Sequence, residues 1–299
     1  MAELPRAVRA LVKSVGGGPV VSVRPLGGGD TSHAASVAVQ AEGGTAHVFA
    51  KWAVGVAGET YAAEAEGLRA LAAAAPPELV VPEPLARRAP DAAGPGALVL
   101  PELPVGRPSV TEWRRFGGAL AALHRAPAPG QGYGWHADNW IGSKPQRNGW
   151  STAWPEFFGE RRLLAQRDTV RARGAWDAAW DGRLDRLVTR LPELLPPSPP
   201  RALVHGDLWA GNALATEDGR FALIDPAVYV GHREVDLAMT ELFGGFPPAF
   251  YDGYREAWPP ATGYAERREV YNLFHLVNHL THGPQYRAPV EATLRRFGA

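Results

Sequence analysis

Cysteine is absent from this 299-residue sequence, so a disulfide framework, a thiolate zinc site and a cysteine nucleophile are all excluded. Net charge is absent too, because 31 acidic residues balance 31 basic ones. Proteins that bind nucleic acids or anionic membranes usually carry a basic surface, so neither partner is expected. No apolar run reaches the roughly 18 residues that a transmembrane helix needs. Glu3 and Arg9 interrupt the first apolar stretch, which argues against a signal peptide, and a soluble cytoplasmic protein is predicted.

The composition is otherwise that of a folded protein. Hydrophobic residues make up 45% and charged residues 21% of the chain, which is ordinary for a globular protein and excludes wholesale disorder. A chain of this length buries about three quarters of its unfolded surface and needs no cross-links to hold a core. The length suits one large domain or two domains of about 150 residues each.

The N-terminal third shows the turn signals and β-prone runs of a sheet. The expected strands are residues 20–24, 35–39, 46–52, 79–81 and 97–100. Apolar residues at helical spacing predict helices over 4–15 and over the alanine-rich segment 59–74, which Pro76 and Pro77 end. We therefore predict a five-stranded, mainly antiparallel sheet carrying one helix.

The remainder of the chain, from about Val110, has mainly helical periodicity. Helices are predicted over 111–125, 154–173, 175–191, 235–242, 249–258 and 265–281, with two short apolar strands at 203–204 and 221–224. A short link with Pro and Gly at 103–106 marks the boundary. The expected architecture is α+β with two lobes, a small β-rich lobe over 1–103 and a larger α-rich lobe over 104–299.

The clearest chemical signal is the run HGDLWAGN at 205–212, followed by IDP at 224–226. Asp207 and Asn212 are five residues apart and Asp225 comes later, as in the catalytic loop and the magnesium-binding aspartate of protein kinases. Phosphoryl transfer needs a carboxylate to orient and deprotonate the attacking hydroxyl, a role for Asp207. It also needs hard oxygen ligands for Mg²⁺, a role for Asn212 and Asp225. The alternative, a turn former or helix cap, suits one such residue better than three at these spacings.

A lysine is expected at the phosphate end of this site. The chain has three lysines against 28 arginines, and Lys51 lies in the third predicted strand, like the strand lysine of kinases that holds the α- and β-phosphates of ATP. A buried lysine needs an acidic partner, and Glu64 is preferred to Glu66 because it shares the inward face of Leu68. The alternative leaves Lys51 and both glutamates in solvent.

Backbone groups are expected to complete the nucleotide site. Gly27, Gly28 and Gly29 lie between two strands, where their N–H groups can fold over a triphosphate. The triplet matches neither G-x-G-x-x-G nor a P-loop, and by itself an ordinary hairpin loop is the better interpretation. Position alone assigns adenine to the backbone of the lobe junction, Pro101, Glu102 and Leu103.

With these motifs in place, the sequence resembles the fructosamine kinase (ketosamine kinase) family, a branch of the aminoglycoside-phosphotransferase-like kinases with a protein-kinase-like fold. The resembling segments are GGGDTS at 27–32, the Lys51 strand, LAALH at 120–124, DNWIGSKPQ at 138–146, WPEFF at 154–158, HGDLWAGN at 205–212 and IDPAVYVGHREVDLAM at 224–239. HGDxxxxN with a later aspartate is common to many small-molecule kinases, whereas the last two segments together are particular to this family.

The resemblance implies ATP- and Mg²⁺-dependent transfer of the γ-phosphoryl group to the O3 hydroxyl of a sugar that is attached through C1 to an amine. The substrate would be a small ketosamine or a glycated amine, and the 3-phosphate product would tend to shed its amine, a deglycating role. In one respect the chain departs from the family, since some relatives carry a cysteine where this chain has Asp30. Thiol-based regulation through that loop is therefore excluded. We expect a monomer.

Four residues are candidates for the substrate side. Trp209 can stack on a sugar or an amine substituent, or can hold the loop as a core residue. His232 and Glu234 can line the acceptor site or pair with neighbouring charges. Asn139, in a tryptophan-rich loop, is expected to face inward.

Other polar residues are expected to be structural. Asp236 should fix backbone N–H groups of the loops, and His205 should be a structural hydrogen-bonding residue. His275, His279 and His282 share one predicted helix face, a spacing that can bind zinc, but a packed and hydrogen-bonded histidine face is the preferred interpretation.

Two other functions stay open at this stage. One is a phosphotransferase of the same fold that acts on another small hydroxyl compound, such as an amino sugar or a choline-like alcohol. The other is a nucleotide-binding pseudokinase, which is disfavoured because competent residues occupy all five key positions.

Overall fold

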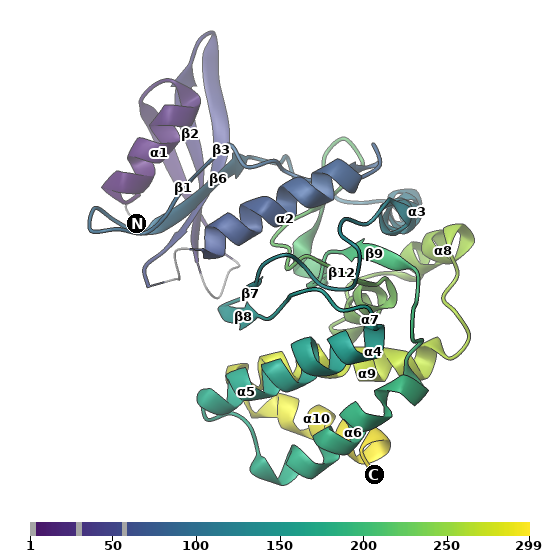
Figure 1. The fold of residues 1–299 in the computed structure, drawn as a ribbon. Coiled ribbons are helices and arrows are strands. Elements are labelled where there is room, and N and C mark those ends of the chain that lie inside the picture. The colour runs from purple at the N-terminus through teal and green to yellow at the C-terminus, as the bar shows by residue number, and fades with distance from the viewer. Residues whose placement is uncertain (1–3, 28–31, 56–58) are drawn as a thin grey trace.

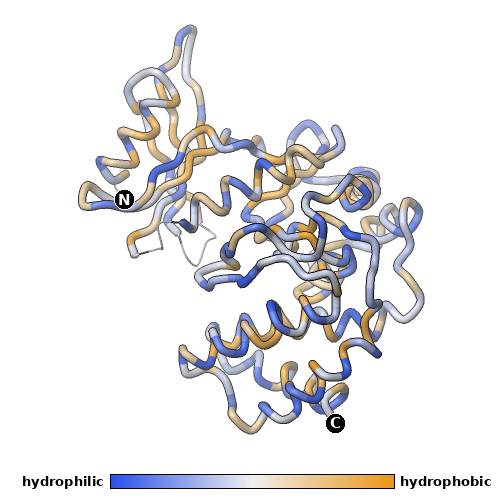
Figure 2. The backbone as a smooth tube through the Cα atoms, in the orientation of Figure 1, coloured by the Kyte–Doolittle hydropathy of each residue, from blue (hydrophilic) through white to orange (hydrophobic). Residues whose placement is uncertain are grey.

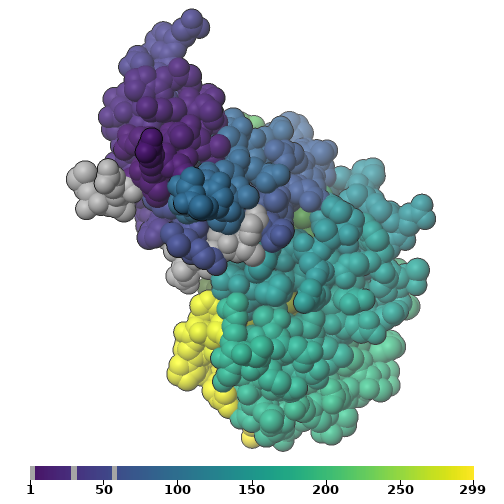
Figure 3. All heavy atoms as spheres, turned by 60° about the vertical axis from the view of Figure 1, so that its left-hand side comes forward, coloured from purple at the N-terminus to yellow at the C-terminus, as the bar shows by residue number. Residues whose placement is uncertain are grey.

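The computed structural model describes residues 4–27, 32–55 and 59–299 and has two lobes (Figure 1). An antiparallel sheet with two helices forms the N-terminal lobe, and the other helices, with short strand pairs between them, form the C-terminal lobe. In the space-filling view, the N-terminal lobe (purple to blue) stands on the teal-to-yellow C-terminal lobe (Figure 3). The predicted α+β class, a small β lobe joined to a larger helical lobe, is confirmed.

The N-terminal sheet has five antiparallel strands in the order β1-β2-β3-β6-β5. Their bounds are β1 Val20–Leu26, β2 His33–Ala41, β3 Gly44–Ala53, β5 Ala86–Arg88 and β6 Gly96–Pro101. Helix α1 (Arg6–Gly16) packs on one face of this sheet, and α2 (Thr60–Ala74) packs on the other. The helices predicted over 4–15 and 59–74 therefore pack on opposite faces of the sheet, which carries two helices where one was expected.

The alternation of side chains along β3 and β6 decides what faces each helix. Val99 packs in the core beneath α1, whereas Leu98 packs against α2, because successive side chains of a strand point to opposite faces. Ala50 of β3 belongs to the α1 side. Strand periodicity therefore points Lys51 at α2, the helix that carries Glu64.

One predicted strand belongs elsewhere. Strand β4 (Leu79–Val80) does not join the N-terminal sheet but pairs in parallel with β11 (Phe221–Leu223) of the C-terminal lobe. Leu79 packs into the large core of that lobe, and Pro82, which lacks an N–H group, limits the extension of the strand. The fifth place in the sheet is taken by β5, whose Ala-Arg-Arg sequence has no apolar pattern. The expectation that 79–81 completes the sheet is wrong.

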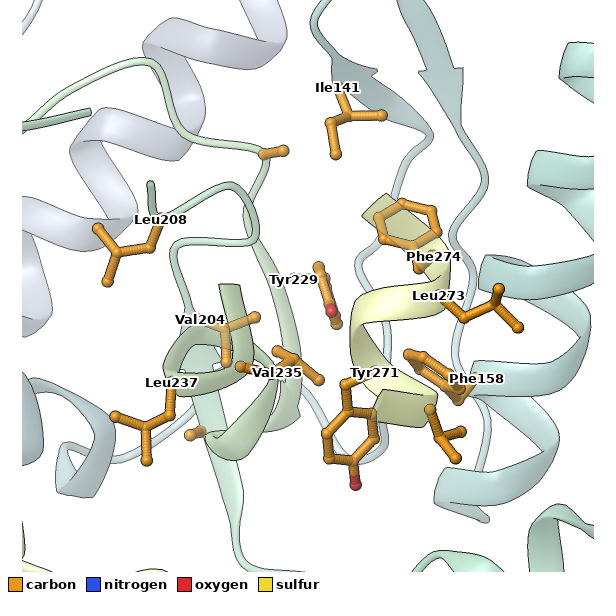
Figure 4. Packing of buried hydrophobic residues seen from close by; sticks show 14 of the residues in the cluster. Ile141, Phe158, Val204, Leu208, Tyr229, Val235, Leu237, Tyr271, Leu273 and Phe274 are labelled. Atoms are coloured by element: carbon orange, nitrogen blue, oxygen red, sulfur yellow. The ribbon is translucent and has the colours of Figure 1, made fainter. Parts of the chain in front are cut away.

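The C-terminal lobe packs its helices around one large core. The helices are α3 Val110–Arg125, α4 Trp154–Phe157, α5 Ala165–Ala172, α6 Asp181–Leu194, α7 Glu234–Leu242, α8 Pro248–Ala257, α9 Tyr264–His279 and α10 Arg287–Phe297. A π-helical segment, Phe158–Leu164, joins α4 to α5. In Figure 4, Phe158 and Tyr229 face Tyr271 and Phe274 of α9, so the core gathers rings from distant parts of the chain.

Short strand pairs bring the two polar runs together near the lobe junction. β9 (Arg201–Val204) pairs with β12 (Tyr229–His232), β10 (Ala213–Ala215) pairs with β11, and β7 (Asn139–Ile141) pairs with β8 (Lys144–Gln146). Backbone hydrogen bonds from Ala227 N to His205 O (2.9 Å) and from Ile224 N to Asn212 O (3.1 Å) join the runs 205–212 and 224–226 directly.

Hydropathy follows this arrangement. Figure 2 shows hydrophobic residues in the strands of the N-terminal sheet, while the helices of the C-terminal lobe alternate between hydrophobic and hydrophilic positions. Alternation of this kind buries one stripe of each helix and leaves the other in solvent. Across residues 4–27, 32–55 and 59–299, no helix combines the length and apolar character needed to span a membrane.

Candidate active site

A tight loop leads from β9 to the predicted catalytic aspartate. Gly206 has φ 80°, and a Cβ there would lie 2.1 Å from the carbonyl oxygen of Ala227, so only glycine fits. The carboxylate of Asp236, in α7, accepts hydrogen bonds from the backbone N–H groups of His205 (2.7 Å) and Gly206 (2.9 Å). His124 of α3 holds the same carboxylate at 3.1 Å. Asp236 therefore anchors the loop backbone, as predicted.

Asp207 lies in a partly buried and negatively charged setting. Its side chain is 19% exposed, and Asn212 donates a hydrogen bond from Nδ2 to its backbone carbonyl oxygen at 2.9 Å. Burial, followed by the negative charges of Asp225 and Asp236, raises the pKa of Asp207 to about 7. A carboxyl group with a pKa near neutrality is suited to accepting and returning a proton at physiological pH.

Lys51 joins the two lobes through two carboxylates. Its Nζ lies 2.5 Å from Oε2 of Glu64 in α2 and 2.7 Å from Oδ1 of Asp225 in the C-terminal lobe. Burial opposes the charge on Lys51, but the two carboxylates outweigh burial and raise the pKa of the lysine. Burial also raises the pKa of Glu64, to about 7, against the attraction of Lys51.

Glu66 has a different position from Glu64. Its carboxylate accepts a hydrogen bond from Nε1 of Trp135 at 3.1 Å and lies 3.0 Å from Nε2 of His136. Helix α2 is thus tied to the C-terminal lobe twice, by Glu64 through Lys51 and by Glu66 through the tryptophan-rich loop. The structure pairs Lys51 with the glutamate that the inward face of the helix indicated.

Asp225 combines a strained backbone with an open side chain. Its φ of 52° makes it the one non-glycine residue with positive φ in the described part of the chain, and such conformations cluster at functional sites. The side chain of Asp225 is 50% exposed, against 9% for the side chain of Lys51. Burial acts to raise the pKa of Asp225, but the ammonium of Lys51 overrides it and holds that pKa below its usual value. The carboxylate is therefore ionised and accessible.

A cavity between the lobes opens at this cluster. Its walls come from both lobes and include Lys51, Glu64, Asp225, Ser32, Tyr61, Asn139 and Trp140. Two of the lining residues from the N-terminal lobe, Ser32 and Tyr61, are hydrogen-bonded through their hydroxyls at 2.9 Å. A cleft with a buried cation, an ionised aspartate and a second aspartate of raised pKa nearby is a candidate catalytic site on physical grounds.

The donor atoms of Asn212 and Asp225 suit a hard divalent cation. Mg²⁺ prefers carboxylate, carbonyl and water oxygens and is commonly held by one or two carboxylates together with substrate phosphates. Nδ2 of Asn212 donates to the backbone of Asp207, which orients the amide so that Oδ1 is its remaining ligand atom. Asp225 adds an ionised carboxylate. These residues fit the ion that the sequence predicted.

The glycine triplet is described only at its first residue. Gly27 follows β1 and is exposed, with no atom within 4 Å of the position that a Cβ would take. Gly28 and Gly29 lie outside the described residues. The expectation that this loop covers the phosphates stays a prediction.

The lobe junction begins where β6 ends at Pro101. The carboxylate of Glu102 accepts a hydrogen bond from Ser36 Oγ at 2.8 Å and pairs with Arg24 at 3.1 Å, which fastens the junction to the sheet. Leu103 follows and is partly buried. The assignment of adenine to this backbone stays a prediction.

Trp209 and Asn139 have contrasting surroundings. Trp209 is 40% exposed, and its ring lies so close to Gly211 that a Cβ there would be 2.2 Å from it. Asn139 is 5% exposed, donates to Val228 O at 2.7 Å and accepts from Gln146 at 2.8 Å. Asn139 faces inward as expected, but its side chain fastens the hairpin of β7 and β8, whereas Trp209 presents an aromatic surface to solvent.

Two of the predicted substrate-binding residues, His232 and Glu234, are buried inside the protein. His232 is 4% exposed and bonds through Nδ1 to the hydroxyl of Tyr271 at 2.8 Å. Glu234 is fully buried and holds Arg267 through two hydrogen bonds of 2.7 and 3.0 Å. A substrate cannot reach either side chain, so their assignment to the acceptor site is wrong. Their alternative role, pairing inside the protein, is what the structure has.

The three histidines near the C-terminus do not share one role. The rings of His279 and His282 are in tilted contact, with centroids 5.0 Å apart, whereas Nδ1 of His275 lies 4.0 Å from Oδ1 of Asp207. The described residues contain no group of three histidine, cysteine or acidic side chains that could hold a metal ion. Helical periodicity could not reveal the position of His275, because its neighbour comes from a loop elsewhere in the chain.

Comparison with known sequences gives a consistent family. The profile described as "Fructosamine kinase" matches residues 6–297. A "Probable ketoamine kinase" of Synechocystis sp. is 41% identical over 240 residues, covering 80% of this chain and 78% of that protein. A chloroplastic protein-ribulosamine 3-kinase of Oryza sativa subsp. indica is 37% identical over 174 residues, 58% of this chain and 50% of that protein.

Solved structures extend the likeness to the fold. A provisionally named fructosamine-3-kinase from Thermobifida fusca YX-ER1 superposes with a TM-score of 0.83 at 31% identity, covering 97% of both chains. A spectinomycin phosphotransferase in complex with ADP and spectinomycin has a TM-score of 0.54 at 16% identity, covering 99% of this chain and 94% of the other. The second likeness is one of fold alone, that of the aminoglycoside-phosphotransferase-like kinases.

Proposed function

This chain belongs to the fructosamine kinase family, and on that premise we propose that it transfers the γ-phosphoryl group of ATP to the O3 hydroxyl of a fructosamine or related ketosamine. The names of its relatives, ketoamine kinase and protein-ribulosamine 3-kinase, support this substrate class. Such a substrate is a sugar joined through C1 to an amine. Phosphorylation at O3 prepares the sugar to shed that amine, so the activity would be deglycating.

Asp207 is the proposed general base. Its carboxylate accepts the proton of the O3 hydroxyl while O3 forms a bond to the γ-phosphorus, and the bond from that phosphorus to the β,γ-bridging oxygen breaks to release ADP. A base with a pKa of about 7 suits this proton transfer near neutral pH. Phosphoryl transfer depends mainly on positioning and charge, so no covalent enzyme intermediate is required.

The donor side is assigned to residues around Lys51. Lys51, oriented by Glu64, would bind the α- and β-phosphates, and the backbone of the glycine triplet and of residues 101–103 would hold the rest of the nucleotide. Asn212 and Asp225 would hold Mg²⁺, which when bound neutralises charge on the phosphates. The distance of 2.7 Å between Lys51 Nζ and Asp225 Oδ1 supports this division, since it sets the phosphate-binding ammonium beside the cation-binding carboxylate.

One observation carries the proposal, the convergence of Lys51, Glu64 and Asp225 on one cavity with Asp207 in the adjoining loop. Lys51 and Asp225 are separated by 174 positions in the sequence. Their contact is therefore a product of the whole fold and has no local structural cause.

A substrate panel with product identification tests the proposal. The protein would be incubated with Mg·ATP and fructosyl-lysine, ribulosyl-lysine or an aminoglycoside, and the phosphorylated position determined by ³¹P and ¹H NMR. A ketosamine 3-phosphate is expected. Asp207→Asn should keep its affinity for Mg·ATP while kcat falls by about 10²–10⁴-fold. Phosphorylation of the aminoglycoside alone, or tight Mg·ATP binding with no ketosamine phosphorylated, would contradict the proposal.

A further inference from the structure

His275 lies behind the proposed base, and none of the roles above uses it. It projects from α9, whose residues 270–278 are all buried, and its side chain is 5% exposed. Tyr271, one turn earlier on the same face, bonds Nε1 of Trp154 at 3.0 Å and Nδ1 of His232 at 2.8 Å. In Figure 4, Tyr271 and its neighbours on α9 pack into the core. The helix that carries His275 is therefore rigidly held.

The nitrogen of His275 that faces Asp207 is unsatisfied. Nδ1 is buried, has no hydrogen-bond partner among the described residues and lies 4.0 Å from Oδ1 of Asp207. Buried polar atoms are nearly always paired, because leaving one unpaired is costly. The other carboxylate oxygen of Asp207, Oδ2, faces Nδ2 of Asn212 at 3.5 Å. The two oxygens of Asp207 thus have different neighbours, and the neighbour of Oδ1 is a nitrogen without a bond.

The imidazole of His275 is neutral. Burial is the main cause and, with the nearby charges of His279 and Arg162, lowers the pKa of His275 to about 3, against the opposing charge of Asp236. A neutral imidazole carries one N–H and can donate it to a carboxylate. An imidazolium at this place would stabilise ionised Asp207 and make it a weaker base. A neutral histidine can orient the carboxylate and lowers its proton affinity less than an imidazolium would.

We infer that His275 is a positioning residue for phosphoryl transfer: Nδ1–H donates to Oδ1 of Asp207 and turns Oδ2 toward the attacking hydroxyl. The inference rests on the proposed function for the identity of the reaction. The approach required is about 1 Å, from 4.0 Å to ordinary hydrogen-bond length. Catalytic hydrogen bonds are often this long without substrate and tighten when it binds. With Oδ1 fixed, a single oriented oxygen is left to accept the proton.

A matched pair of variants tests the role of the donor. His275→Asn places an amide N–H close to the position of Nδ1, whereas His275→Leu fills a similar volume with no donor. His275→Leu is expected to lower kcat by about 10–10²-fold with KM for Mg·ATP and ketosamine nearly unchanged, because a misdirected base slows the chemical step and leaves binding intact. His275→Asn should recover most of kcat. Equal losses in the two variants would overturn the inference.

A double-mutant cycle separates positioning from packing. In the Asp207→Asn background, His275→Leu should cause no further loss of kcat, since His275 acts through the carboxylate that is already gone. A loss that multiplies that of Asp207→Asn would show that His275 acts elsewhere and would overturn the inference. Thermal unfolding of each variant serves as the control for folding.

Imidazole ¹⁵N NMR gives a readout that does not depend on turnover. Among the nine histidines, the signals of His275 are assigned by their disappearance in His275→Asn. Nδ1 is expected to carry the proton, and its shift should change in Asp207→Asn. If no ketosamine is phosphorylated but this response is present, the proposed function fails and the contact with Asp207 stands. If the protein is active but Nδ1 carries no proton, the positioning role is refuted.

Discussion

Two loops of the C-terminal lobe each follow a short strand and carry an aspartate, Asp207 after β9 and Asp225 after β11. The two aspartates differ in their surroundings. Asp225 touches the ammonium of Lys51 at 2.7 Å, is 50% exposed, and has a pKa below its usual value. Asp207 is 19% exposed, has the neutral His275 beside it, and has a pKa of about 7. The ammonium of Lys51, from β3, keeps Asp225 ionised, which suits its proposed role as a cation ligand. Burial and two neighbouring carboxylates raise the pKa of Asp207, which suits its proposed role as a proton acceptor.

Removal of the Asp225 carboxylate is expected to have the largest effect on catalysis. Asp225→Ala should abolish Mg²⁺-dependent nucleotide binding and lower kcat/KM by about 10³-fold or more, because several kilocalories per mole of charge neutralisation are lost. Calorimetric titration with Mg·ATP and steady-state kinetics measure the two losses. Asp207→Asn is the matched control and should still bind Mg·ATP. The two roles are not separate if both variants lose nucleotide affinity.

Removal of the Lys51 ammonium should reduce the difference in pKa between Asp225 and Asp207. Lys51→Met keeps the length of the side chain but leaves Asp225 and Glu64 without their shared charge, and kcat/KM should fall by about 10²-fold. Lys51→Arg should recover only part of this, because a planar guanidinium does not replace a compact ammonium between two carboxylates. Lys13→Met, at an exposed position on α1, is the control. Unchanged kinetics for Lys51→Met would remove Lys51 from the site.

Sequence spacing predicted the polar residues of both loops because those residues lie within short, continuous stretches of the sequence. HGDxxxxN and the later aspartate follow apolar strands, and the inward face of α2 indicated Glu64 as the partner of Lys51. The electrostatic difference between Asp207 and Asp225 could not be predicted. It depends on burial and on which charges the fold brings close, and those charges come from β3, α2 and α7.

The errors have the same origin. The strand at 79–81 has the right apolar character for the N-terminal sheet, but its partner, β11, lies far along the chain. The closeness of His232 and Glu234 to the Asp225 loop in sequence predicts that they share its cleft, yet β12 and α7 turn both side chains into the core. The packing predicted for His275 is confirmed by its burial, but helical periodicity identifies a buried face without identifying the loop that packs on it.

The smallest predicted effect is on stability, and it should have opposite signs at the two aspartates. The pKa of Asp207 is about 7 in the folded protein and about 4 in an unfolded chain, so the folded state holds an extra proton between these values. The free energy of unfolding therefore falls as pH rises through this window, and Asp207→Asn, which stays neutral, removes that dependence. The melting temperature of Asp207→Asn should exceed that of the wild type by more at about pH 8 than at about pH 4.5, by a few degrees.

The pKa of Asp225 is lowered in the folded state, so its ionised form adds stability above about pH 4 that is lost in acid. Asp225→Asn should then be destabilised, relative to the wild type, by more at about pH 5 than at about pH 3. Scanning calorimetry of Asp207→Asn at about pH 4.5 and 8, and of Asp225→Asn at about pH 3 and 5, measures the contrast. Stability differences that change with pH in the same direction in both variants would contradict the two environments assigned here.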